Sequence, residues 1–142
     1  MDRVGEGLYI ADIEQAGTHR LYTDHGITAV VQLTYQPPDE GYPENVHHDQ
    51  FEMMDGPRND RQAMRAAIEK TVERLAAGER VVVHCAAGLS RSVGVAAGAL
   101  SLHEGITFTD ALQRIAEIKR VNIHDVVHQH ARQAVQQLDR AD

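Results

Sequence analysis

Short apolar runs alternate with longer stretches of helical periodicity along the first hundred residues. The runs near residues 8–10, 27–33, 51–54 and 81–83 are rich in β-branched or large apolar side chains and predict strands. The last run, Val-Val-Val, is apolar on both faces, which is typical of a strand buried within a parallel sheet. Residues 36–43 contain Pro-Pro and a glycine and predict a loop.

Apolar residues spaced three and four apart predict five helices. In the helix of residues 60–77, Asn59 or Asp60 serves as N-cap and Gly78 lies just past the end. An earlier helix runs from Ile13 to about His25, with Gly17 in its middle. The other three are expected near residues 92–103, 109–120 and 125–138.

Strands that alternate with helices, followed by helices alone, predict the α/β class. We expect a three-layer α/β/α sandwich around a central, mostly parallel sheet of four to five strands. A ligand site should then lie beyond the carboxyl ends of these strands. No repeat, linker or charge block divides residues 1–142, so we expect one domain.

The charge balance limits the class of partner. Lysine and arginine number 14 against 21 aspartate and glutamate, giving a formal charge of −7. Such a field repels nucleic acid and anionic membranes, so neither is expected as a partner, and an anionic substrate must be captured locally. The sequence shows no secretory leader and no run of membrane-spanning length, so we expect a cytoplasmic protein, with a monomer favoured.

Cys85 is the single cysteine. It excludes an intramolecular disulfide framework, a cysteine-rich zinc site and a redox relay of two cysteines within the chain. Such a residue either packs in the core or acts as a nucleophile.

Residues 81–92 join an apolar strand through a short loop to a helix of small residues. Gly88 permits an unusual φ, so the N–H groups of the loop can point inward and form an anion-binding cup. The N-terminus of the following helix adds its dipole. This arrangement would bind a tetrahedral dianion and stabilise a thiolate at Cys85, while the planar guanidinium of Arg91 can bind two oxygens at once.

The order of residues in this segment resembles a known signature. His84-Cys85, two residues, Gly88, two residues and Arg91-Ser92 match the cysteine-dependent protein tyrosine phosphatases, and the short chain resembles their dual-specificity branch. Residues 7–11 and 26–34 are similar to early strands of that family. We call residues 84–92 the signature loop.

The resemblance implies a role for each residue of the signature loop, without a metal or cofactor. Cys85 would attack phosphorus, Arg91 would bind the phosphoryl oxygens, and the Ser92 hydroxyl would help the sulfur to leave. His84 would orient the loop and tune the thiol. The substrate would be bound by Ala86, Ala87, Gly88, Leu89, Ser90 and Arg91.

The same family uses an aspartate that protonates the departing oxygen and then activates water, because an alkoxide or phenoxide is otherwise a poor leaving group. Asp55, at the end of the predicted strand of residues 51–54, is our candidate. The alternative interpretation is that Asp55 is an ordinary turn residue of the Asp-Gly-Pro sequence. Asp60, Asp49 and Asp39 are alternatives, although Asp60 suits a helix cap and Asp49 would lie at the opposite end of the strand.

Nine histidines raise the possibility of a metal site. His124 and His128 share a helical face, and His47 adjoins His48, yet Asp125 is the single carboxylate near the first pair in sequence. Metal sites need converging ligands, so solvated surface histidines are the preferred interpretation and no metal is expected.

The expected substrates are phosphotyrosine and also phosphoserine or phosphothreonine of proteins or peptides. The inositol-lipid branch of the family has lysines inside the loop, where this chain has Ala86, Ala87, Leu89 and Ser90, so the loop suits a single phosphoryl group. Two alternatives are a module that binds phosphorylated partners without turnover and a rhodanese-like sulfurtransferase; an arsenate reductase lacks its resolving cysteine here.

One departure from the family concerns residues 121–125, Val-Asn-Ile-His-Asp, where many dual-specificity members have a Pro-Asn pair. Whatever that asparagine contributes to the signature loop is supplied here by Asn122, by His124 or by no residue.

Overall fold

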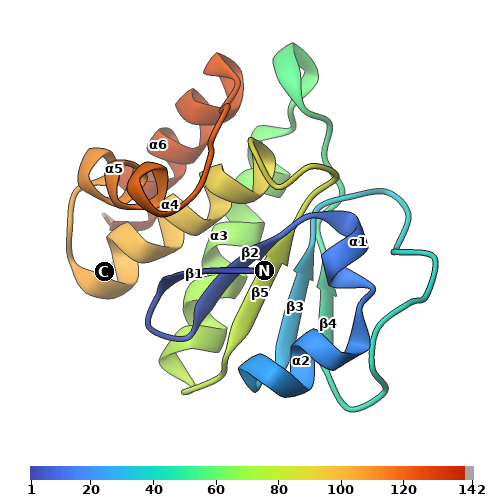
Figure 1. Cartoon of the computed structure of the whole chain (residues 1–142). Coiled ribbons are helices and arrows are strands. Elements are labelled where there is room, and N and C mark those ends of the chain that lie inside the picture. The colour runs from blue at the N-terminus through green and yellow to red at the C-terminus, as the bar shows by residue number, and fades with distance from the viewer. Residues whose placement is uncertain (140–142) are drawn as a thin grey trace.

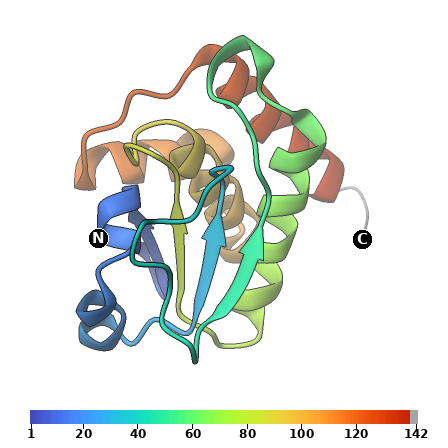
Figure 2. The ribbon, with the colours of Figure 1, turned by 90° about the vertical axis from the view of Figure 1, so that its right-hand side faces the viewer.

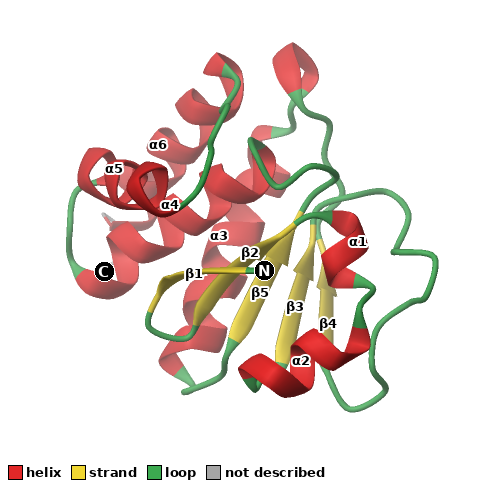
Figure 3. Cartoon of the chain, in the orientation of Figure 1, coloured by secondary structure: helices red, strands yellow, loops and turns green. Residues whose placement is uncertain are grey.

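A computed structural model describes residues 1–139 and has a five-stranded sheet at its centre (Figure 3). The strand order is β1-β2-β5-β3-β4. β1 pairs with β2 antiparallel, and the other neighbours are parallel. The strands are β1 (Asp2–Gly5), β2 (Leu8–Ala11), β3 (Ala29–Gln32), β4 (His47–Gln50) and β5 (Val81–His84).

Helices cover both faces of the sheet, which confirms the three-layer α/β/α sandwich (Figures 1 and 2). Two short helices lie on one face, and four longer helices lie on the other. The helices are α1 (Ile13–Ala16), α2 (His19–His25), α3 (Arg61–Ala76), α4 (Arg91–Glu104), α5 (Phe108–Ile118) and α6 (Asp125–Asp139), with a 3-10 turn η1 (Gly56–Arg58) before α3. None of the helices within residues 1–139 has the length and apolar character needed to cross a membrane.

Side-chain alternation along the strands divides the core between the two faces. Val81 and Val83 of β5 belong to the larger cluster, beneath α3 and α4, whereas Val82 belongs to the smaller cluster beneath α1 and α2. The small residues of α4 permit close packing, because a Cβ at Gly98 would lie only 2.6 Å from Cδ1 of Ile68 on α3. α3 and α4 therefore pack closely against each other on this face of the sheet.

The predicted strand of residues 51–54 is wrong, because the chain pairs with β3 one step earlier, along His47–Gln50. β4 is an edge strand with an exposed surface, so it is polar and lacks the apolar pattern of a buried strand. Met53 serves the core instead, Phe51 packs partly against it, and Met54 is exposed. Met53 is fully buried while its N–H donates to the Leu33 carbonyl at 3.1 Å, outside the strand ladder.

Two further details differ from the sequence prediction. The helix expected from Ile13 to His25 is split, because Gly17 caps α1, and a Cβ there would lie 2.8 Å from Cβ of Pro38. β1 was not predicted, because Asp2–Gly5 is mostly polar and pairs at the sheet edge. The last four predicted helices agree with α3 to α6 within one or two residues at each end.

Candidate active site

The parallel strands end at one edge of the sheet, and the signature loop begins there, directly after β5. Gly88 has φ +72°, and a Cβ on it would lie 3.2 Å from the Ala11 carbonyl oxygen at the end of β2. A side chain at this position is therefore disfavoured by both conformation and space. The loop closes tightly over the strand ends and enters α4 at Arg91.

Three backbone carbonyls of the loop accept hydrogen bonds from residues outside the loop. The donors are the Ile13 N–H to Ala86 (3.0 Å), the Lys119 ammonium to Gly88 (2.6 Å) and the Asn122 N–H to Leu89 (2.9 Å). In a trans peptide the N–H points opposite to the carbonyl. The N–H groups of the residues that follow, Ala87, Leu89 and Ser90, therefore face away from these donors, as an anion-binding cup requires.

Cys85 lies at the base of this loop and is 2% exposed. Its Sγ is 3.1 Å from Oγ of Ser92, which is fully buried. Ser92 is not the N-cap of α4, because the helix starts at Arg91 and Ser92 lies inside its first turn, where the hydroxyl faces the sulfur.

Arg91 reaches from the start of α4 to the segment that leads to the candidate acid. Its Nη1 donates to the Met53 carbonyl at 2.9 Å. One edge of the guanidinium is thereby anchored, and its other N–H groups remain as donors for a ligand. We call residues 53–58 the acid loop.

The acid loop and the signature loop lie side by side (Figure 1). The Ser90 hydroxyl donates to Oδ1 of Asp55 at 2.6 Å and accepts from the His124 backbone N–H at 3.0 Å. Asp55 is thus brought to the loop that contains Cys85. Near the position of the missing Pro-Asn pair, the backbone N–H groups of both Asn122 and His124 donate to the signature loop.

The three competing aspartates have other contacts. Asp60 caps α3 by accepting from the N–H groups of Gln62 and Ala63 at 2.9 and 3.1 Å. Asp49 lies within β4, not before the strand, and forms an ion pair with Arg74 at 3.1 Å. Asp39 is exposed and lines a surface groove beside α1.

His84 belongs to a buried polar network behind the loop. Its Nε2 lies 2.6 Å from the Tyr42 hydroxyl, and its Nδ1 lies 3.4 Å from the Cys85 carbonyl oxygen. The Gln32 Oε1 joins the Tyr42 hydroxyl at 2.8 Å and Nε2 of His48 at 2.9 Å. Burial lowers the pKa of His84 to about 4, so the ring is neutral at pH 7. The neutral ring therefore lies between the Tyr42 hydroxyl and the backbone of the signature loop.

Several of these supporting residues were not identified from the sequence. The signal for Gln32 was a polar residue at the end of an otherwise apolar strand, and the signal for Lys119 was its rarity, since the chain has two lysines. Burial lowers the pKa of the Lys119 ammonium. Asn59, considered as a cap, instead donates from Nδ2 to the Met54 carbonyl at 2.7 Å.

The histidines that raised the metal hypothesis have protein partners or lie apart. His124 Nδ1 accepts from the Val126 N–H at 3.1 Å, and His128 packs edge-on against Phe108. Within residues 1–139, no three histidine, cysteine or acidic side chains gather as a metal site.

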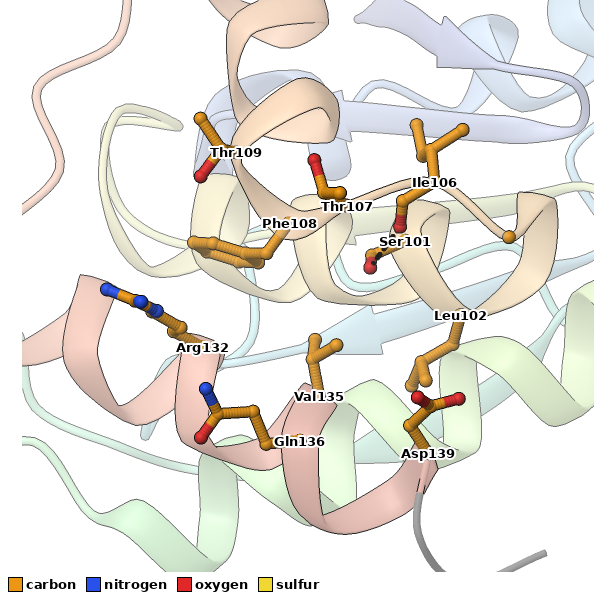
Figure 4. A pocket seen from close by; sticks show the side chains of 11 residues that line it. Ser101, Leu102, Ile106, Thr107, Phe108, Thr109, Arg132, Val135, Gln136 and Asp139 are labelled. Carbon is orange, nitrogen blue, oxygen red and sulfur yellow. Dashed lines mark hydrogen bonds between the residues drawn. The ribbon is translucent and has the colours of Figure 1, made fainter.

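A separate surface pocket of about 460 Å³ lies between the end of α4, the start of α5 and α6 (Figure 4). Phe108, Arg132 and Val135 are among its lining residues, and none comes from the signature loop or the acid loop. The pocket is therefore not part of the candidate active site.

Comparisons with known proteins agree with the signature loop. No protein-family model matches the chain. The dual specificity protein phosphatase 26 of Bos taurus is 30% identical over 123 residues, which cover 82% of this chain. In sequence and in fold the chain is similar to the cysteine-dependent dual-specificity phosphatases. It spans 58% of the length of that bovine relative, and the human protein of the same name is 27% identical over the same share.

Solved structures of the superfamily share the fold. A mouse putative dual specificity phosphatase, complexed with zinc tungstate, superposes with a TM-score of 0.85 at 25% identity, over 99% of this chain and 88% of that one. Human DUSP28 gives a TM-score of 0.88 over the whole of both chains. At 20% identity, the second likeness concerns the fold alone.

Proposed function

We propose that this protein hydrolyses phosphomonoesters on protein side chains through a cysteinyl-phosphate intermediate, with no metal and with residues 1–142 acting as one catalytic domain. The observation that carries the proposal is the 2.6 Å hydrogen bond from Ser90 to Asp55. It places a carboxylate beside the loop that contains the nucleophile, although the two are far apart in sequence. A cysteine that only packed in the core would not require a carboxylate beside its loop.

In the first step, the Cys85 thiolate attacks phosphorus, an S–P bond forms and the P–O bond of the ester breaks. Asp55 gives its proton to the departing oxygen, which leaves as the neutral alcohol or phenol. The N–H groups of the signature loop and the free edge of Arg91 bind the phosphoryl oxygens while charge builds on them.

In the second step, water attacks phosphorus and gives a proton to the Asp55 carboxylate. The S–P bond breaks, and inorganic phosphate and the thiolate are released. Ser92 Oγ, 3.1 Å from Sγ, donates a hydrogen bond to the departing sulfur. Asp55 thereby returns to its protonated form, ready for the next cycle.

The substrate class follows from the residues on the rim of the loop. Ala86 and Ala87 are exposed and uncharged, and Gly88 has no side chain, so these residues of the loop offer no cation for a second phosphate. This supports phosphotyrosine together with phosphoserine and phosphothreonine in proteins or peptides. The complex of the similar mouse protein with zinc tungstate, whose anion is a tetrahedral dianion, also favours a phosphoryl-sized ligand.

The working form needs a reduced thiol, so we propose a reducing compartment such as the cytoplasm, and a monomer as the acting species. A binding module without turnover, or a rhodanese-like sulfurtransferase, is the alternative. Steady-state hydrolysis of p-nitrophenyl phosphate excludes the first, and thiocyanate formation from thiosulfate and cyanide would reveal the second.

The role of Asp55 is tested with esters of graded leaving-group ability. In Asp55→Asn, hydrolysis of phenyl phosphate should fall about 100-fold or more, the usual scale of general acid catalysis. Hydrolysis of 2,4-dinitrophenyl phosphate, whose leaving group needs no proton, should fall far less. The matched control is Asp39→Asn, an exposed aspartate that should behave like the wild type on both esters. Equal losses on both esters in Asp55→Asn would assign the acid to another residue.

A further inference from the structure

We infer that Asn59 is a positioning residue for the general acid and that His130 on α6 orients it. The inference rests on the proposed function, since it concerns the proton donor of that reaction. Asn59 precedes α3 and is 6% exposed. Its side-chain amide makes two hydrogen bonds, one to the acid loop and one to α6.

The first hydrogen bond fixes the backbone of the acid. Asn59 Nδ2 donates to the Met54 carbonyl at 2.7 Å. This carbonyl belongs to the same rigid peptide plane as the N–H of Asp55. Holding that oxygen therefore limits the rotation of the plane and sets the direction in which the Asp55 side chain leaves the backbone.

The second hydrogen bond fixes the amide of Asn59. The Met54 carbonyl can only accept, so Nδ2 must face it and Oδ1 must face His130. Oδ1 lies 2.9 Å from Nδ1 of His130, so this nitrogen carries the proton of the ring. A flipped amide would set its oxygen against the Met54 carbonyl oxygen, and the hydrogen bond from His130 Nδ1 to Oδ1 further stabilises the observed orientation.

Three consecutive residues of the acid loop each accept a hydrogen bond from a different side chain. The Met53 carbonyl accepts from Arg91, the Met54 carbonyl accepts from Asn59, and the Asp55 carboxylate accepts from Ser90. Two of these donors belong to the signature loop, and Asn59 is the one that connects the acid to α3 and α6. Asp55 is thus held from both sides before any substrate binds.

The test replaces the donor by an acceptor of the same shape. In Asn59→Asp, a carboxylate oxygen faces the Met54 carbonyl and repels it. Hydrolysis of phenyl phosphate should fall about tenfold or more, a part of the full general-acid effect. Hydrolysis of 2,4-dinitrophenyl phosphate and the inhibition constant of tungstate should stay near wild-type values. Damage to the fold or to the anion cup would instead change both measurements.

His130→Ala is the second variant, in case Asn59→Asp does not fold, and it should shift the leaving-group dependence in the same direction by a smaller factor. His128→Ala is the matched control, because His128 is on the same helix but packs against Phe108. In an Asp55→Asn background, Asn59→Asp should have no further effect on phenyl phosphate, since the acid it positions is gone.

The outcomes separate this inference from the proposed function. If the wild-type protein hydrolyses both esters but Asn59→Asp and His130→Ala reduce both equally, or reduce neither, Asn59 does not position the acid. If the wild type hydrolyses neither ester, the proposed function itself is refuted, and this role of Asn59 with it.

Discussion

The hydroxyl of Ser90 donates a hydrogen bond to Oδ1 of Asp55 over 2.6 Å while it accepts one from the His124 backbone N–H over 3.0 Å. A hydroxyl has one proton, and the contact with His124 commits that proton to Asp55. With Oδ1 occupied in this way, Oδ2 would be the oxygen that carries the transferable proton in the proposed reaction. Ser90 of the signature loop would then determine which oxygen of Asp55 faces the substrate.

Replacing Ser90 by Ala should therefore impair the acid more than the nucleophile. A hydrogen bond to a charged group contributes about 1.5–3 kcal/mol, so a partial loss corresponds to about a tenfold slower hydrolysis of phenyl phosphate. The rate with 2,4-dinitrophenyl phosphate should change little. The ratio of the two rates is the measurement, and an unchanged ratio would show that Ser90 does not orient Asp55.

Gly88→Ala should disrupt the anion cup. A left-handed φ costs a residue with a side chain about 1–2 kcal/mol, and the new Cβ would also press on the Ala11 carbonyl at 3.2 Å. We expect lower thermal stability and loss of tungstate binding, measured by calorimetry. Gly105→Ala is the control, because Gly105 has the same φ of +72° with no atoms within 4 Å of its Cβ position. Normal tungstate binding by Gly88→Ala would contradict the geometry of the loop.

His84 should make stability dependent on pH. Burial lowers its pKa from 6.5 to about 4, so the unfolded chain binds the proton more readily than the folded one. The contribution of the neutral His84 ring to the free energy of unfolding is fully present above pH 6.5. It is lost as the pH falls toward 4, on the order of 3 kcal/mol in total. Urea unfolding of the wild type and of His84→Gln at several pH values measures it. The variant should show a flatter profile across this window, and parallel profiles would refute a buried neutral ring.

Lys119→Met should weaken oxyanion binding without reaching the ligand itself. The ammonium donates to the Gly88 carbonyl at 2.6 Å and so fixes the peptide whose N–H, on Leu89, faces the cup. We expect the dissociation constant of tungstate to rise about tenfold, equivalent to about 1.4 kcal/mol. Lys70→Met is the control, since Lys70 pairs with Glu73 on the surface of α3. Equal dissociation constants of tungstate in the two variants would show that Lys119 does not stabilise the loop.

The sequence was sufficient for the fold class, because strands and helices alternate along the chain, and for the strand, loop and helix order of residues 81–104, which is local. Val81-Val82-Val83 followed by Gly88, Arg91 and a helix of small residues leaves few conformations that bury the strand. The prediction for Asp55 also named a residue that the structure brings to this loop, although the reason given, a strand at residues 51–54, was wrong.

The supporting contacts could not be predicted, because they join segments whose spacing in the chain carries no signal. Lys119 reaches the signature loop from the end of α5, and Asn59 meets His130 across 71 residues. The polar edge strand His47–Gln50 was missed for a related reason, since only its pairing with β3 makes it a strand. Each of these depends on the tertiary arrangement and not on local preference.

The covalent step of the proposed reaction can be observed directly. Ser92→Ala should slow the departure of the sulfur and let the intermediate accumulate, so the variant is mixed with p-nitrophenyl phosphate, quenched in acid within its turnover time and digested for mass spectrometry. The account predicts one phosphoryl group on the peptide that contains Cys85, attached to sulfur. A phosphoryl group on any other residue, or steady turnover by a Cys85→Ser variant, would contradict it.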